Sequence, residues 1–241
     1  MSTRVFLGPT LGHADARAIL PRADLRPPAA LGDVHRGVRD GCRLLVLVDG
    51  YFEHVPAVWH KEILFALSEG VRVVGAASMG ALRAAELHPY GMTGVGGVFA
   101  RFRDGTLDGD DEVAVAHEDE EHGFRAVSEP MVNVRAALET AEAEQRIGPA
   151  AAAGIVAVGT SMYYPERTWE SLLRAAATEV RETELAGLRA FLAERKPDLK
   201  RDDAVQALRA CQASRLPDPV PAPDFVRTNA WECFLAAQGE P

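Results

Sequence analysis

A turn between a predicted strand and a predicted helix contains a serine that could act as a nucleophile. Ser78 lies in the segment Ala76-Ala77-Ser78-Met79-Gly80. A nucleophile on such a turn needs very small residues two positions away on either side, because backbone segments crowd there. Ala76 and Gly80 meet that requirement. Amides near Met79 and Gly80, at the start of the helix, would then face a developing oxyanion.

The same position has a purely structural explanation. Small residues often precede helices, and Ser78 could be an N-cap residue whose hydroxyl satisfies a helix amide. The residues alone leave both interpretations open and favour the N-cap.

A second segment supplies a carboxylate and two possible bases. Asp49 ends an apolar run and precedes Gly50, and a carboxylate there is costly unless it is paired or used. Lys61 is the only lysine before residue 196 and lies near an apolar helix face. A desolvated lysine with a lowered pKa can serve as the general base to a serine, and His60 could do the same. The alternative is that His60 and Lys61 are ordinary helix side chains.

Other candidate segments are weaker. The glycine-rich segment 91–97 could bind an anion or act as a hinge. It lacks the pattern of a P-loop. The five-residue spacing of His117 and His122 splits them across a helix, which predicts a solvated acidic face rather than a metal site. Arg135 could hold a carboxylate. The cysteines have no metal-ligand spacing and no cofactor motif occurs, so we predict neither a metal nor a cofactor.

The predicted elements bring the first two segments to one edge of a parallel sheet. Three apolar runs are predicted strands: 5–7, 44–48 and 71–74. Helical patterns flank them at 14–20, 33–40, 56–67 and 81–87. This succession predicts an α/β fold with a doubly wound parallel sheet, in which chemistry collects at the carboxyl ends of the strands. Those ends are followed by Gly8, by Asp49-Gly50 and by Ser78.

The second half of the chain has a mainly helical pattern. A helix is predicted from Ser128 to about Arg146, and helical spacing continues beyond it. Residues 216–223 are rich in proline and are predicted to be extended. We therefore expect an α/β core over residues 1–147 and a helical C-terminal region over residues 148–241.

Composition excludes several classes of protein. The 241 residues hold 26 Lys+Arg and 35 Asp+Glu, a net charge of −9, which disfavours binding to nucleic acid or to an anionic membrane surface. No apolar run approaches the ~20 residues of a membrane span, and the N-terminus lacks the pattern of a signal peptide. The three cysteines form no disulfide framework. We expect a cytoplasmic protein.

Several motifs, in their order along the chain, resemble the TfuA-like family. They are Asp49-Gly50-Tyr51-Phe52, His60-Lys61-Glu62-Ile63-Leu64, residues 75–87 around Ser78, Gly91-Met92-Thr93-Gly94-Val95-Gly96 and Ser128-Glu129-Pro130-Met131-Val132-Asn133-Val134-Arg135. The resemblance covers about residues 3–147, and the tail after Pro149 has no family pattern.

The resemblance implies a partner of a YcaO enzyme in the thioamidation of peptide backbones. Such a partner supplies the sulfur: it hydrolyses the C-terminal thiocarboxylate of a small ThiS-like carrier protein and releases sulfide. A carrier that ends in a flexible Gly-Gly tail would need a narrow cleft, which glycines 91–97 could border. The alternative is a noncatalytic adaptor that binds a YcaO enzyme or its precursor peptide in ribosomal peptide modification.

The resemblance also reverses the preference at Ser78, which becomes the expected nucleophile. Lys61 or His60 is then the expected base, and Asp49 could orient or tune it. Direct activation of water, with Ser78 only binding substrate, stays open. The expected substrate-binding residues are Gly8, Gly50, Met79, Gly80 and Arg135.

Overall fold

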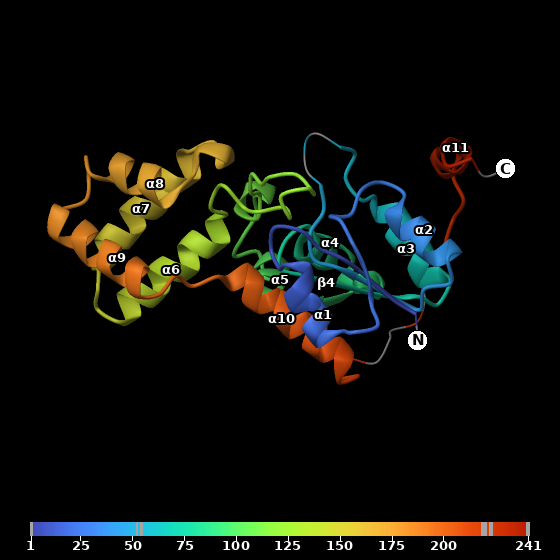
Figure 1. The fold of residues 1–241 in the computed structure, drawn as a ribbon. Helices are drawn as coiled ribbons and strands as arrows, with labels where there is room; N and C mark the ends of the chain where they lie inside the picture. Colours follow the sequence, from blue (N-terminus) through green and yellow to red (C-terminus); the bar gives the residue numbers. More distant parts are fainter. Residues whose placement is uncertain (1, 52, 54, 218–220, 222–223, 240–241) are drawn as a thin grey trace.

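The centre of the fold is a five-stranded parallel sheet in the described part of the chain, which is residues 2–51, 53, 55–217, 221 and 224–239 of a computed structural model (Figure 1). Its strands are β1 (Thr3–Phe6), β2 (Asp24–Arg26), β3 (Leu44–Leu47), β4 (Arg72–Ala76) and β5 (Thr93–Val95). All neighbouring strands are parallel, in the order β2-β1-β3-β4-β5. The direction of winding therefore switches between β1 and β3, the place where open parallel sheets bind ligands.

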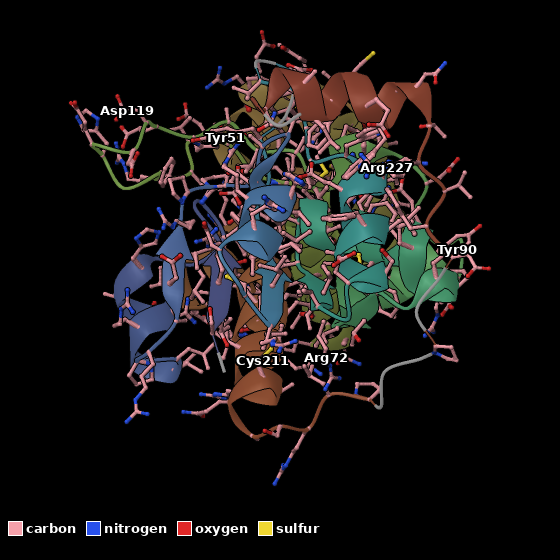
Figure 2. The ribbon with its side chains drawn as sticks, turned by 90° about the vertical axis from the view of Figure 1, so that its right-hand side faces the viewer. Tyr51, Arg72, Tyr90, Asp119, Cys211 and Arg227 are labelled. Carbon is pink, nitrogen blue, oxygen red and sulfur yellow. The ribbon has the colours of Figure 1, made fainter. Side chains whose placement is uncertain are left out.

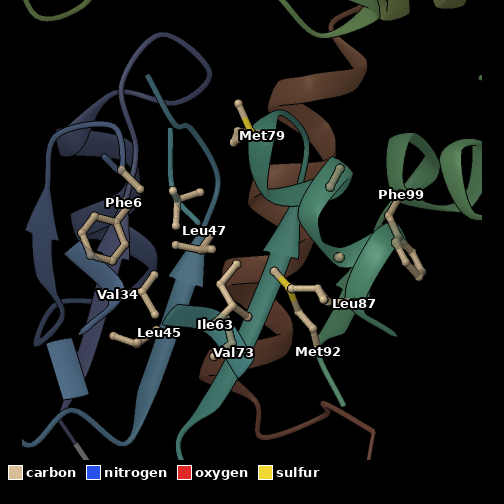
Figure 3. Packing of buried hydrophobic residues seen from close by; sticks show 14 of the residues in the cluster. Phe6, Val34, Leu45, Leu47, Ile63, Val73, Met79, Leu87, Met92 and Phe99 are labelled. Atoms are coloured by element: carbon tan, nitrogen blue, oxygen red, sulfur yellow. The ribbon is translucent and has the colours of Figure 1, made fainter. Parts of the chain in front are cut away.

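Helices cover both faces of this sheet, so the predicted α/β class is confirmed. One face packs against α2 (Asp33–Arg39), α3 (His60–Ser68), α4 (Met79–Leu87) and α5 (Gly97–Arg103). Figure 3 shows part of this core, with Leu45, Leu47 and Val73 of the sheet near Ile63 of α3. The central strands β1, β3 and β4 bury apolar side chains on both faces, as expected inside a parallel sheet.

The second face of the sheet is covered by helices from opposite ends of the chain. These are α1 (His13–Ile19) and α10 (Leu199–Gln212), which lie side by side (Figure 1). Val5, Val46 and Val74 of the strands pack with Ala204, Ala207 and Leu208 of α10. A helix far along the sequence thus completes the core of the N-terminal sheet.

Four further helices form a separate apolar core: α6 (Met131–Ala143), α7 (Pro149–Ser161), α8 (Trp169–Ala176) and α9 (Glu182–Glu194). Helix α8 begins with Thr168, whose side chain accepts a hydrogen bond from the Ser171 amide. The last helix, α11 (Asn229–Ala237), packs Trp231 and Phe234 near Trp59 and Phe65. The division expected at residue 147 stays a prediction, although α6 packs with the helices that follow it. No described helix combines the length and apolar character of a membrane span.

The structure corrects the predicted elements in two respects. Helix α3 begins at His60 rather than near Pro56, because the segment before it is extended. The Pro56 carbonyl accepts from the Leu31 amide, and Ala57 forms a β-bridge with Ala30. The prediction also missed β2 and β5, since each has only three residues. Most of the proline-rich segment 216–223 lies outside the described residues.

Candidate functional site

The turn between β4 and α4 is tightly constrained. The Ser78 amide donates to the Ala76 carbonyl at 2.7 Å, and Ala77 between them has a φ of 67°, a strained conformation for a residue with a side chain. A Cβ on Gly80 would lie 1.8 Å from the Leu47 oxygen, and one on Gly75 would lie 2.0 Å from the Gly80 oxygen. Crowding therefore demands glycine at 75 and 80, whereas the sequence pattern placed the two small residues at 76 and 80.

The Ser78 side chain is not an N-cap, although the residue occupies that position. Its hydroxyl makes no capping hydrogen bond to the helix, and the residue is 7% exposed. Of the two amides expected at an oxyanion site, that of Gly80 donates to the Val48 carbonyl at 3.2 Å. The Met79 amide has no backbone acceptor within the residues that the structure describes. The Ser78 hydroxyl and the Met79 amide are therefore the groups of this turn that a substrate could meet.

Asp49 holds the loop at the switch point between β1 and β3. Its Oδ2 accepts from the amides of Gly8 at 2.8 Å and Thr10 at 3.1 Å. Its Oδ1 accepts from the Thr10 hydroxyl at 2.6 Å. The carboxylate is buried, and the three donors offset the cost of burying it. Gly8 is itself crowded in this loop, because a Cβ added there would lie 2.6 Å from the Pro28 ring.

A cavity of about 370 Å³ lies above these groups. Its lining comes from the ends of β3 and β4, from residues 110–117 and from the connection between α7 and α8. The predicted site residues Asp49, Gly50, Ser78 and Met79 all line it. Tyr51 also lines it and lies on the side where the loop with Asp119 projects (Figure 2). The structure therefore brings the two predicted segments together at one cavity.

His117 lines the same cavity. Its Nδ1 donates to the Glu118 carbonyl at 2.7 Å, which leaves Nε2 of the neutral ring as a proton acceptor. The prediction of a solvated acidic face is wrong for His117, which is half-buried between Tyr51 and Phe124. No local pattern could have shown this, because the position of His117 depends on a β-bridge with Ala126.

The two predicted bases lie elsewhere. The Lys61 Nζ donates to the Val226 carbonyl at 2.7 Å and lies 5.0 Å from the centre of the Phe225 ring. The His60 Nε2 is 2.7 Å from a carboxylate oxygen of Glu86, and its side chain is 43% exposed. Neither residue lines the cavity that contains Ser78. The geometry therefore does not support a base from the first turn of α3.

The motif from Ser128 to Arg135 supports the cavity wall. The Ser128 Oγ accepts from the Ala116 amide at 2.8 Å. The Arg135 guanidinium donates to the Glu112 carboxylate, with Nη2 at 2.6 Å from Oε1, and this pairing raises the pKa of Arg135. Arg135 thus holds a carboxylate, as expected, but one of its own chain, and it does not line the cavity.

The glycine-rich segment also binds an anion of its own chain. The amides of Gly97 and Val98 donate to the two oxygens of Asp203 on α10, at 2.8 and 2.7 Å. Burial raises the pKa of Asp203, whereas these amides oppose that rise. Glycines 91–97 line neither this cavity nor a second one that adjoins it.

Lys200 is a buried lysine that the sequence did not single out. It is 2% exposed, and its Nζ donates to the Val113 carbonyl at 2.9 Å. Burial lowers the pKa of Lys200, while Asp49 and Asp198 oppose that effect. The desolvated lysine that the sequence predicted at position 61 is therefore found at position 200. The sequence gives only one weak indication of Lys200, which is that the chain has only three lysines.

The sequence of the chain matches a known protein family. The model of the family described as TfuA-like protein matches residues 49–168, about half of the chain. The chain belongs to the TfuA-like family. Within this TfuA-like chain the matched range includes Asp49, Ser78 and His117, whereas Thr10 and Lys200 lie outside it. A comparison with curated proteins gives no match.

Proposed function

We propose that this protein hydrolyses the C-terminal thiocarboxylate of a small ThiS-like carrier protein and supplies the sulfide to a YcaO enzyme that thioamidates a peptide. Membership of the TfuA-like family supports the pathway. The observation that supports the hydrolase is the Ser78 hydroxyl, which makes no cap bond and lines a cavity with Asp49 and His117. Acyl transfer requires a nucleophile, a proton acceptor and donors for the oxyanion.

The reaction divides into two steps. In the first, the Ser78 Oγ attacks the thiocarboxylate carbon, its proton passes to a base, and the C–S bond breaks. The sulfur leaves with that proton as sulfide, and an ester to Ser78 remains. In the second step, water attacks this ester, one of its protons returns to Ser78, and the other passes from the new carboxylic acid to the hydrosulfide. The sum converts a thiocarboxylate and water into a carboxylate and hydrogen sulfide.

His117 is the proposed base, in place of Lys61 or His60. Its Nδ1–H is fixed by the Glu118 carbonyl, so Nε2 is available to take and return a proton. The Met79 amide and the N-terminus of α4 would stabilise the tetrahedral oxyanion. Asp49 contributes by fixing the loop from Gly8 to Thr10 at the edge of the cavity.

Sulfide release from a thiocarboxylated carrier tests the nucleophile. Ser78→Ala should remain folded and lose turnover by about 10³-fold or more, because the ester can no longer form. Ser161→Ala is the matched control: its hydroxyl bonds the Val158 carbonyl on the exposed end of α7, so turnover should be unchanged. Undiminished turnover in Ser78→Ala would remove Ser78 from the reaction.

The same assay separates the bases. His117→Gln should lower kcat by about 10²-fold or more, whereas Lys61→Met and His60→Gln should stay within about twofold of the wild-type rate. Loss of activity in Lys61→Met alone would instead identify Lys61, on α3, as the base.

Excess free sulfide distinguishes the hydrolase from an adaptor without hydrolytic activity. If the YcaO enzyme still needs this protein under that condition, the proposed hydrolase role fails.

A further inference from the structure

A second cavity, of about 260 Å³, adjoins the first. Pro9 and Val115 line both cavities. The lining of the second is polar and includes two of the three lysines of the chain, Lys196 and Lys200. The proposed reaction uses none of the charged side chains that line it, so their arrangement needs another explanation.

Lys200 has more hydrogen-bond donors than the protein satisfies. A lysine ammonium has three N–H donors, and the Val113 carbonyl accepts one of them at 2.9 Å. Among the described residues no other group accepts from its Nζ, and no carboxylate pairs with it. A buried ammonium with open donors is costly unless an anion meets it.

The carboxylates that line this cavity have partners other than Lys200. Glu129 pairs with Lys196. Asp198 accepts from the Asn133 side chain at 2.9 Å and from the Arg201 amide at 3.0 Å. Asp49, which lines the first cavity, is saturated by the loop from Gly8 to Thr10. Asp198 and Asp49 oppose the effect of burial on Lys200 without forming an ion pair with it, so the Lys200 ammonium keeps donors that no carboxylate of the described residues meets.

The surroundings hold Lys200 in place and add further donors. Its backbone amide donates to the Asn133 Oδ1 at 3.1 Å, and Asp203 fixes α10 to the start of α5. The N-terminus of the 14-residue helix α10 adds partial positive charge at the same place. Ser128 also lines the cavity, and its hydroxyl proton has no described acceptor. Such a rigid set of donors is typical of a binding site.

We propose that the second cavity is a carboxylate-binding subsite in which Lys200 and Ser128 bind the anionic end group of the carrier tail. This inference rests on the proposed function for the identity of the anion, which is the thiocarboxylate before hydrolysis and the carboxylate after it. Because Pro9 and Val115 line both cavities, this subsite lies directly beside the cavity that Ser78 lines. Of the other lysines, Lys196 has an ion-pair partner and Lys61 is partly exposed, whereas Lys200 is buried without a paired carboxylate among the described residues.

The test uses a synthetic peptide that ends in Gly-Gly with a free carboxylate, and the same peptide as its C-terminal amide. The full-length protein should bind the carboxylate form about 10-fold more tightly, because only that form pairs with the ammonium. Lys200→Met should bind both forms equally. Lys61→Met is the matched control and should keep the full preference for the carboxylate. The Lys61 ammonium donates to the Val226 carbonyl and lines neither cavity.

A second measurement does not require that the Lys200→Met variant folds. With only three lysines in the chain, an NMR spectrum of ¹³Cε-labelled lysine has three signals, and Lys61→Met and Lys196→Met assign them. The carboxylate peptide should shift the Lys200 signal and the amide peptide should not. Equal binding of the two peptides, or no shift at Lys200, overturns the subsite. These measurements need no turnover, so failure of the hydrolase proposal, which the sulfide-release assay detects, is seen separately.

Discussion

At the scale of single residues, the candidate site depends on how each polar group is satisfied. Asp49 has three donors, the Ser78 hydroxyl has no cap partner, and Lys200 has one acceptor. Groups that are fully satisfied by the protein build the site, whereas groups that are incompletely satisfied are available to a substrate. By this criterion Asp49 supports the structure of the site, whereas Ser78 and Lys200 are available to a substrate.

Asp49 allows a quantitative prediction. Asp49→Ala should lower the free energy of unfolding by about 2–4 kcal/mol, because three donors lose their acceptor in a buried place. Asp49→Asn should cost less, since its carbonyl oxygen can accept from both amides and its amino group can donate to Thr10. Urea denaturation measures both variants. Asp15→Ala is the control, as Asp15 forms an exposed pair with Arg201, worth about 0–1 kcal/mol. Equal stability of Asp49→Ala and Asp15→Ala would contradict this account.

At the scale of elements, the contact between β3 and α4 positions Ser78. Gly80 lies so close to Leu47 that a methyl group has no space, and the strained φ of Ala77 lies in the same turn. Helix α3, by contrast, begins later than its sequence pattern indicates, because the preceding segment pairs with residues 30 and 31. Its first turn, with His60 and Lys61, faces Glu86 and the segment before α11.

Gly80→Ala tests this contact. We expect a loss of about 3 kcal/mol or more in the free energy of unfolding, because the new Cβ would lie 1.8 Å from the Leu47 oxygen and backbone atoms must move. Gly12→Ala is the control, since nothing lies within 4 Å of its added Cβ and its φ is −64°. Because Gly12 is the N-cap residue of α1, where alanine is less favourable than glycine, that change should cost at most about 1 kcal/mol. A Gly80→Ala protein as stable as wild type would show that the turn is not constrained by this approach.

At the scale of the whole molecule, the C-terminal helices complete the N-terminal sheet. Helix α10 covers its second face and places Lys200 beside the wall formed by residues 113–116. Helix α11 returns to α2 and α3, where Trp231 packs between Phe65 and Phe234. Residues outside the range that matches the TfuA-like family therefore line the cavities at this edge of the sheet: Pro9 lines both and Lys200 lines the second.

The burial of Lys200 predicts how stability depends on pH. Its pKa is lowered from the ordinary value of 10.5, with Asp49 and Asp198 opposing the effect. Between its folded pKa and 10.5, the unfolded chain binds a proton that the folded chain does not. Stability therefore rises with pH across that window, with a slope of at most about 1.4 kcal/mol per pH unit.

The measurement compares wild type with Lys200→Met by urea denaturation between about pH 7.5 and 9.5, in a buffer without carboxylates. The variant lacks this proton, so the free energy of unfolding of the wild type should rise relative to that of Lys200→Met as pH increases. Lys61→Met, which removes a partly exposed lysine, should run parallel to wild type. Parallel curves for Lys200→Met and wild type would mean that the Lys200 ammonium is not desolvated.

The sequence by itself determined the central strands, the parallel α/β class, and the placement of Asp49 and Ser78 at the same edge of the sheet. Those features follow from local information: apolar runs define the strands, and very small residues mark the turn. Only the tertiary structure decided which basic side chains lie near that edge. Lys200 meets Val113 across 87 positions because α10 packs on the second face of the sheet, and His117 turns inward because of its bridge to Ala126. Neither contact has a local pattern, since both are set by how distant segments pack.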